Sequence, residues 1–286
     1  MEQKNNKSYI SGMHPFVKWA GGKTQLLGEI KNLLPSEFNN YYEPFVGGGA
    51  LFFSLAPKNA YINDQNTELI CAYQCFTSQS FFEGLKTRLK EHEKNNSEEY
   101  YFQIRSEDRK NGFINRPIYE RAARMIYLNK ACFNGLYRVN SKGYFNVPFN
   151  KKDKIATFSE DNFNAINDYF KNNHIHISND DFEECVKSAA KDDFVYFDPP
   201  YDIFPDKQGF VDYAKQGFDR NEQIRLKNCF KELSNKGVKV MLSNHNTHFI
   251  NEIYHEFKIH VVDAKRMINS DATKRGNVKE VIITNY

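Results

Sequence analysis

Residues 194–197 form a short apolar run that passes directly into Asp198, Pro199, Pro200 and Tyr201. The run has the length and residue types of a buried strand. Pro199 holds Asp198 in an extended conformation and Pro200 fixes its own φ, so the strand must end in a stiff corner. Because neither proline has an N–H group, the carbonyls of Asp198 and Pro199 remain acceptors beside the carboxylate. This arrangement suits a flat exocyclic amine, which has hydrogens to donate.

Such an amine is a poor nucleophile, because on a base like adenine its lone pair is delocalised into the ring. It attacks an electrophile only if its hydrogens are held, which Asp198 and a proline carbonyl would do. Tyr201 would lie on the face of the base, where aromatic stacking is worth about 1–3 kcal/mol. In a duplex the nucleotide must first be flipped out. The alternative interpretation is a plain proline turn in which Tyr201 is ordinary packing.

The rest of the chain alternates between helix and strand patterns, as in an α/β protein. Apolar residues between 26 and 34 recur at helical spacing and stop at Pro35. A helix pattern between residues 224 and 233 ends at Gly237. A further helix is expected at residues 50–55, and strands are expected at 41–45, 60–63, 174–177, 194–197, 238–242, 259–262 and 280–284.

The stretch from residue 67 to about 131 is helical and charged and contains no strand pattern, and residues 136–148 have the composition of a β-hairpin broken at 141–143. We interpret this stretch as an insertion. The predicted organisation is a catalytic domain of residues 1–66 and 151–286, with an inserted recognition domain of residues 67–150.

A glycine turn at residues 45–49 follows one predicted strand and precedes a predicted helix. Its backbone N–H groups and close backbone approach suit a polar ligand. Asp64 follows the next strand, near the spacing at which an acidic residue takes the ribose hydroxyls of an adenosine cofactor in doubly wound folds. Phe52 replaces the third glycine of the dinucleotide fingerprint, which disfavours a dehydrogenase.

Gly22, Lys23 and Thr24 match the end of a phosphate-binding loop, but Val17 stands where that motif requires glycine. We therefore reject an ATPase or other nucleotide hydrolase. A glycine turn followed by a lysine at a helix N-terminus still suits an anion, such as the carboxylate of a ligand.

Positive charge is concentrated in one segment. The net charge of the 286 residues is +3, yet residues 121–152 contain no acidic residue and seven basic ones: Arg121, Arg124, Lys130, Arg138, Lys142, Lys151 and Lys152. Aromatic residues are interleaved with them, namely Tyr127, Phe133, Tyr137, Tyr144 and Phe145. This pattern predicts contact with phosphates and bases, and a merely solvated basic face is the alternative.

Cysteine usage and hydropathy set the expected compartment. The five cysteines form no CxxC pair, so neither a disulfide framework nor a zinc site is indicated. No apolar stretch approaches the roughly 20 residues needed to cross a bilayer. We expect a cytoplasmic protein with no membrane contact.

Five motifs occur in the order found in the Dam-type adenine-N6 DNA methyltransferases: FVKWAGGK (16–23), EPFVGGG (43–49), NGLYR (134–138), FNVP (145–148) and DPPY (198–201). The resemblance spans nearly the whole chain. The chain is especially similar to the DpnM-like modification enzymes that act on GATC. It implies a Rossmann-like, seven-stranded AdoMet-dependent methyltransferase sheet with the last strand antiparallel, and an inserted helical and hairpin DNA-recognition domain.

The resemblance also implies roles for individual residues. Asp198, Pro199, Pro200 and Tyr201 would hold the flipped adenine. The residues expected at AdoMet are Trp19, Lys23, Phe45, Gly47, Gly49, Asp64, Asp181, Phe182 and Asp198. No metal is required, and Asp198 needs no raised pKa because it acts as an acceptor.

Sequence recognition is expected from the inserted segment. Arginine paired with guanine is the commonest specific contact in the major groove, and the resemblance assigns this role to Arg138. The other expected DNA contacts are Lys18, Phe133, Asn134, Leu136 and Pro148. Phe133 replaces the tyrosine of the Dam relatives, which keeps a wedge but loses a hydroxyl.

The predicted partners are double-stranded DNA and a restriction endonuclease that acts on the same site without a stable complex. Two other classes remain open on sequence alone. An RNA or cytosine-N4 methyltransferase would share the cofactor site, although the cytosine enzymes commonly carry Ser at the place of Asp198. A noncatalytic DNA-binding module would explain the basic segment, but it would not explain Asp64 or the Asp-Pro-Pro-Tyr corner.

Overall fold

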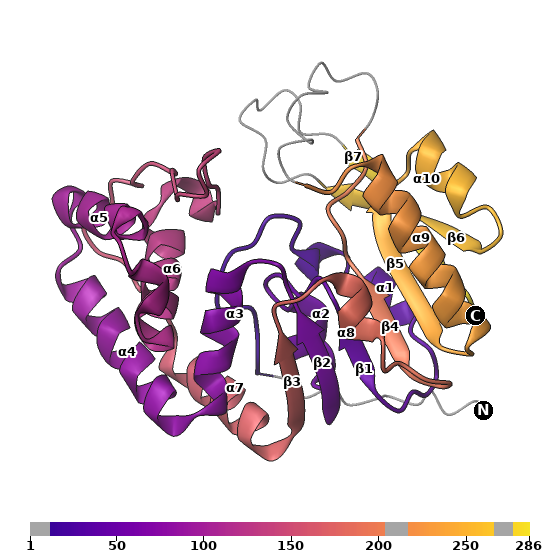
Figure 1. Ribbon diagram of the computed structural model, residues 1–286, viewed down its shortest axis with the longest axis horizontal. Helices are drawn as coiled ribbons and strands as arrows, with labels where there is room; N and C mark the ends of the chain where they lie inside the picture. Colours follow the sequence, from indigo (N-terminus) through magenta and orange to yellow (C-terminus); the bar gives the residue numbers. More distant parts are fainter. Residues whose placement is uncertain (1–11, 204–216, 266–276) are drawn as a thin grey trace. The chain divides into compact units, whose positions relative to one another are not determined.

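The computed structural model describes residues 12–203, 217–265 and 277–286 (Figure 1). The chain divides into two compact units. The first contains Met1–Gly22, Gly47–Lys58 and Asp64–Asn179, and the second contains Lys23–Val46, Asn59–Asn63 and Asp180–Tyr286. The predicted insertion at residues 67–150 lies inside the first unit, and its boundaries as a recognition domain stay a prediction.

A mixed seven-stranded sheet has the order β3-β2-β1-β4-β5-β7-β6. Strands β1, β2, β4 and β5 pair in parallel, whereas β7 pairs antiparallel with β5 and with β6. This confirms the predicted α/β methyltransferase-like sheet with antiparallel last strands. The strands are β1 (Tyr41–Glu43), β2 (Asn59–Asn63), β3 (His174–Ser178), β4 (Phe194–Phe197), β5 (Lys239–His245), β6 (Lys258–Lys265) and β7 (Asn277–Thr284).

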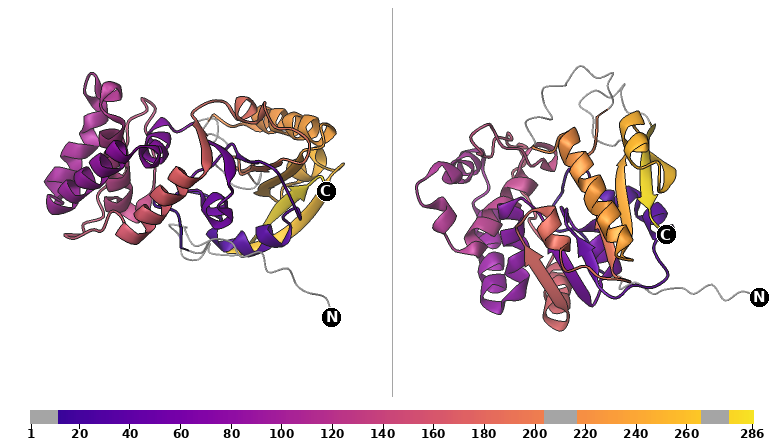
Figure 2. Two further views of the ribbon diagram at one scale, coloured as in Figure 1. Left: turned by 90° about the horizontal axis from the view of Figure 1, so that it is seen from below. Right: turned by 45° about the vertical axis from the view of Figure 1, so that its right-hand side comes forward.

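The core of the second unit lies between its strands and helix α9 (Arg220–Asn235), which runs alongside β5 (Figures 1 and 2). All four residues of β4 are buried, as expected for a central parallel strand covered on both faces. Asp219 caps α9 by accepting hydrogen bonds from two backbone N–H groups. The other helices of this unit are α1 (Leu27–Asn32), α8 (Phe182–Val186) and α10 (His248–Ile253), with a 3-10 turn at Lys23–Gln25.

The first unit is mainly helical, and α6 (Ile118–Ala131) packs against both α3 (Thr67–Gln74) and α4 (Gln79–Lys94). An aromatic cluster around Phe16 adds apolar contact with Tyr73 and Phe76. The remaining α-helices are α2 (Ala50–Leu55), α5 (Glu98–Arg105) and α7 (Glu160–Asn172). Over the residues that the structure describes, no helix has both the length and the apolar character needed to cross a membrane.

The predicted hairpin at residues 136–148 forms a shorter chain reversal than expected. Its only ladder pairing among the described residues is an isolated bridge between Val139 and Phe145. The Asn140 side chain accepts hydrogen bonds from the backbone N–H groups of Lys142 and Tyr144. These side-chain hydrogen bonds close the turn, and the backbone of the two arms adds hydrogen bonds from Asn140 N to the Tyr144 carbonyl and from Asn146 N to the Arg138 carbonyl.

His92 on α4 provides a test of the packing of the first unit. Its Nδ1 lies 2.8 Å from the Tyr100 hydroxyl, and its ring stacks on Tyr127 with centroids 4.9 Å apart. Burial lowers the pKa of His92 to about 4. Because the unfolded chain binds this proton near pH 6.5, the folded state loses stability as the pH falls from there toward 4.

We predict that the free energy of unfolding of the wild type drops by about 2 kcal/mol more than that of His92→Phe between about pH 7.5 and about pH 5. Urea unfolding at the two pH values measures this difference. His248→Phe serves as the control, since the His248 side chain is 95% exposed. Equal losses in the wild type and His92→Phe would show that His92 is not the buried neutral group.

Candidate active site and DNA-contacting loops

The strand-terminal corner of the second unit holds a carboxylate, a cation and an aromatic ring together. Lys23 Nζ lies 2.9 Å from Asp198 Oδ1, with only 7% and 17% of the two side chains exposed. The same ammonium group lies 4.4 Å from the centroid of the Tyr201 ring. Tyr201 donates its hydroxyl to Glu280 Oε2 at 3.1 Å. Three of the predicted site residues are therefore in direct contact.

The ionisation of Asp198 reflects two opposing effects. Burial raises the pKa of Asp198, and the nearby charge of Lys23 opposes that rise. A raised pKa makes the carboxyl group harder to ionise, and the role of Asp198 as a hydrogen-bond acceptor stays a prediction. Lys23 favours the charged form, which accepts hydrogen bonds and cannot donate them.

Asn63, at the end of β2, organises the segment that leads to Asp181. Its Nδ2 donates to the carbonyls of Pro44 and Asp180, both at 3.0 Å, and its Oδ1 accepts from Asp180 N at 2.8 Å. The following rings, Phe45 and Phe182, have centroids 5.5 Å apart. Sequence reasoning did not single out Asn63, although a polar residue that ends a buried strand is a recognisable pattern.

Asp181 and Phe182 lie at the start of α8. The Asp181 carboxylate caps this helix by accepting from Glu183 N, and it is ion-paired with Arg225. Phe182 is buried in the core cluster, with the Arg225 guanidinium 4.4 Å from its ring centroid. The Phe182 ring therefore has little surface left for a ligand. Its backbone N–H belongs to the first turn of a helix, where N–H groups have no intrahelical partner.

The glycine turn of the first unit is fixed by Asp64. Gly47 N donates to Asp64 Oδ2 at 3.0 Å, and Asn66 N donates to Asp64 Oδ1 at 2.8 Å. Burial raises the pKa of Asp64, and these two backbone hydrogen bonds oppose the rise. Each carboxylate oxygen keeps a second lone-pair direction, so Asp64 is oriented by the turn and can still accept from a ligand hydroxyl.

Both outer glycines of the turn are required by sterics. Gly47 has φ 48° and Gly49 has φ 73°, a region that favours glycine. A Cβ atom at Gly47 would lie 2.8 Å from Cδ1 of Trp19, and one at Gly49 would lie 2.6 Å from the hydroxyl of Tyr73. Trp19 itself stacks on Tyr137, with centroids 5.1 Å apart.

The side chain of Asn129 links two segments of the first unit that are predicted to contact DNA. This buried amide accepts from Lys18 N at 2.9 Å and donates to the carbonyls of Lys18 and Gly135. The Lys18 side chain is exposed, and the loop at Phe133–Gly135 is held beside its backbone. The role of Asn129 was not predicted from the sequence, because the neighbouring residues do not show that this helical asparagine holds the backbone of two loops.

The loop presents its predicted residues outward. Phe133 is 52% exposed, which is unusual for such a large apolar side chain, and its N–H donates to the Pro148 carbonyl at 2.9 Å. Asn134 has φ 58° and is exposed, as are Pro148 and Arg138. Leu136 is half-buried. Arg138 Nε donates to Asn146 Oδ1 at 2.8 Å, which orients the guanidinium group at the surface.

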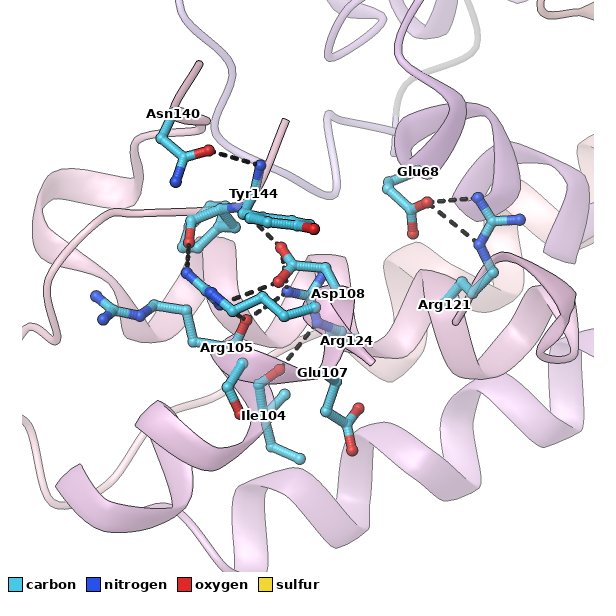
Figure 3. Close-up of polar contacts among 12 residues, drawn as sticks. Glu68, Ile104, Arg105, Glu107, Asp108, Arg121, Arg124, Asn140 and Tyr144 are labelled. Carbon is cyan, nitrogen blue, oxygen red and sulfur yellow. Dashed lines mark hydrogen bonds and ion pairs between the residues drawn. The ribbon is translucent and has the colours of Figure 1, made fainter. Parts of the chain in front are cut away.

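Two of the seven basic residues predicted to face DNA are internal, which corrects that prediction. Arg124 is 4% exposed, lies 2.8 Å from Asp108 Oδ2 and donates to the Ile104 carbonyl (Figure 3). Arg121 pairs with Glu68 (Figure 3). Two of the interleaved aromatics, Tyr127 and Phe145, are also buried. Arg121 and Arg124 on α6 pair with carboxylates that are distant in sequence. Lys130 is half-buried, whereas Arg138, Lys142, Lys151 and Lys152 are exposed.

The chain is similar to known methyltransferases along most of its length. It is 45% identical over 274 residues to the Type II methyltransferase M1.LlaDCHI of Lactococcus lactis subsp. cremoris, covering 96% of each chain. It is 38% identical to the Type II methyltransferase M.MjaIII of Methanocaldococcus jannaschii, covering 95% of this chain and 99% of the relative. The DNA adenine methylase of Haemophilus influenzae is 34% identical, with 94% of this chain and 92% of the relative covered.

Residues 19–268 match the family described as D12 class N6 adenine-specific DNA methyltransferase. This range includes the glycine turn, Asp64, the exposed loop at Phe133–Gly135 and the Asp198 corner. This match favours an adenine-N6 DNA methyltransferase over the cytosine-N4, RNA and noncatalytic interpretations. The chain belongs to the D12 class N6 adenine-specific DNA methyltransferase family and is an AdoMet-dependent enzyme that methylates adenine in DNA.

Proposed function

We propose that this enzyme methylates N6 of an adenine flipped out of duplex DNA at GATC sites. The observation that carries the proposal is the corner after β4, where a buried carboxylate and an aromatic ring follow a strand that ends in two prolines. A base inside a duplex cannot reach such a corner, so the target nucleotide must leave the helix. The resemblance to the DpnM-like enzymes supports GATC as the site.

At this corner Asp198 and the Pro199 carbonyl accept the two amine hydrogens, and Tyr201 lies on the face of the base. Bound AdoMet supplies a methyl group on a positively charged sulfur. Transfer of that methyl group would break its bond to sulfur, leave the bonding electrons on the sulfur and form a bond to the amine nitrogen, which would become positive. The Asp198 carboxylate stabilises that charge until the nitrogen loses a proton. Most of the acceleration comes from holding the reactants in line.

The cofactor residues of the two units fit the chemical groups of AdoMet. In the first unit, Asp64 accepts the ribose hydroxyls, while Trp19 and the backbone at Gly47 and Gly49 form the adjoining wall. In the second unit, Lys23 is a cation suited to the carboxylate of the ligand, and Phe45 lines an apolar wall. Asp181 and the Phe182 N–H offer an acceptor beside a donor, which matches the amine and N1 of the cofactor adenine.

Recognition uses the exposed loop of the first unit. Arg138 makes a bidentate contact to a guanine in the major groove. Phe133 inserts as a wedge beside the flipped nucleotide, with Asn134, Leu136 and Pro148 around the bases and Lys18 reaching a base from its own segment. Relatives named as Type II methyltransferases support a restriction-modification context, in which an endonuclease cleaves the same unmethylated site.

We predict that duplexes containing GATC accept a tritiated methyl group from AdoMet and that duplexes changed at any one base of the site accept it at least about tenfold more slowly. Each mismatched base pair in a site typically costs about 1–3 kcal/mol, which is the physical reason for the loss. Digestion of the product to nucleosides shows whether the label is on adenine N6. Equal labelling of all duplexes would overturn GATC as the site.

We predict that Asp198→Ala slows single-turnover methyl transfer by about 100-fold or more, because a preorganised acceptor at the developing charge is lost. Duplex binding should largely survive, since the recognition residues lie in other segments. Fluorescence anisotropy with a labelled duplex measures binding, and Asp168→Ala on the exposed face of α7 is the control. Near-normal turnover of Asp198→Ala would remove this carboxylate from the mechanism.

We predict that Arg138→Ala and Lys151→Ala weaken binding in different ways. Loss of a guanine contact costs about 1–3 kcal/mol on cognate DNA and relaxes sequence choice at one position. Loss of a phosphate contact weakens cognate and noncognate duplexes alike and lowers the salt dependence of binding. Titrations of both duplexes over a range of salt concentrations separate the two effects, and identical behaviour of the two variants would contradict the division.

A further inference from the structure

Two buried amide side chains, hydrogen-bonded to each other, hold the backbone of the catalytic corner in the second unit. Gln223, in the first turn of α9, donates its Nε2 to the Pro200 carbonyl at 2.7 Å. Asn244, on β5, donates its Nδ2 to Gln223 Oε1 at 3.1 Å. Asn244 Oδ1 in turn accepts from the N–H groups of Asp202, at 2.9 Å, and His245, at 2.8 Å. Gln223 and Asn244 are 1% and 0% exposed.

The backbone groups on either side of this pair of amides determine the direction of each of its hydrogen bonds. The Pro200 carbonyl can only accept, so Gln223 must present its NH₂ group to it and its oxygen to Asn244. The Asp202 N–H can only donate, so Asn244 must present its oxygen there and its NH₂ group to Gln223. Two neutral amides in this orientation satisfy all the groups, whereas an ionised carboxylate at either position would face an acceptor.

Other contacts anchor the residue that follows the corner. The Asp202 carboxylate accepts from Thr247 Oγ1 at 2.7 Å and lies 3.2 Å from Arg220 Nε. The Asp202 carbonyl lies 2.6 Å from His245 Nδ1. Among the residues that the structure describes, the charged or titratable groups that these contacts link to the amide pair are Asp202, Arg220 and His245. The backbone after the prolines is therefore held by side chains from α9 and from the end of β5.

This arrangement fixes the one torsion that the prolines leave soft. The ring of Pro200 fixes its φ, whereas its ψ is free in principle and decides where Tyr201 lies relative to Asp198. The hydrogen bond from Gln223 holds the Pro200 carbonyl and thereby that ψ. We propose that Gln223 and Asn244 are positioning residues for methyl transfer, an inference that rests on the proposed role of the Asp198 corner.

The test compares Gln223→Leu with Gln223→Glu. Gln223→Leu lacks both hydrogen bonds and should lower the single-turnover rate by about 10–100-fold at every pH, since small misplacements of reacting groups have effects of this size. The dissociation constants of AdoMet and duplex should change by less than about threefold, because neither contact touches a ligand. Gln223→Glu differs because a protonated carboxyl group can still donate to the Pro200 carbonyl and accept from Asn244.

Burial raises the pKa of the introduced carboxyl group, so this group is protonated at the acidic end of the range. The rate of Gln223→Glu divided by that of the wild type should therefore approach one near pH 5.5 and fall about tenfold or more as the pH rises to about 8.5. Dividing by the wild-type rate removes the pH effects that the two enzymes share. Asn244→Asp should show the same trend, because its ionised form cannot donate to Gln223.

A flat ratio for Gln223→Glu, or a Gln223→Leu rate within twofold of the wild type, would overturn the inference. If Gln223→Leu does not fold, the pH trend of the two carboxyl variants decides the question. Asp198→Ala in the same assay separates the two proposals. If it is inactive while the ratio is flat, only the positioning role fails, and if it is active, the proposed role of the corner fails as well.

Discussion

The end of a fully buried strand at two consecutive prolines is the constraint on which the site depends. β4 pairs with β1 and β5, so its last residue leaves the sheet between two neighbours and not at an edge. Ligands of open α/β sheets bind beyond the carboxyl ends of the strands, and the prolines ensure that Asp198 stops there. The backbone beyond it cannot continue the ladder, so its polar groups must find other partners. Side chains of α9 and β5 provide them.

The ion pair in this corner is better explained by a role in ligand binding than by a gain in stability. Two charges removed from water have a desolvation cost that their attraction only partly offsets, so a buried pair such as Lys23 and Asp198 is weak evidence of a stabilising contact. A carboxyl group whose pKa is raised by burial and opposed by one specific cation is typical of functional sites. Lys23 is in addition a cation suited to a ligand carboxylate. This favours the proposed role of the pair in ligand binding, with the Lys23 charge favouring the ionised form of Asp198.

Local patterns predicted many of the elements, and they singled out Lys23, Asp198 and Tyr201, which the structure brings into contact. The helix expected at 50–55 and the strand expected at 194–197 have those bounds, because apolar runs with glycine or proline at their ends leave little choice. Contacts between distant residues could not be predicted in this way. Nothing near Arg121 or Arg124 in the sequence indicates Glu68 or Asp108, so a count of basic residues overstated the DNA-facing charge. Helices α7, α8 and α10 were not anticipated, and α8 has only five residues.

Three residues to which sequence reasoning assigned no role share one chemical property, which explains both where they lie and why the sequence did not reveal their role. Asn129, Gln223 and Asn244 are buried amides that hold loop backbone, the first in one unit and the other two in the second. An amide donates and accepts at fixed geometry without the desolvation cost of a charge, so it can replace the missing strand partner of an irregular segment. The local sequence does not distinguish such an amide, on a helix or on a strand, from any other polar residue, so only the three-dimensional arrangement shows which ones hold the segments that carry the proposed DNA-contacting and catalytic residues.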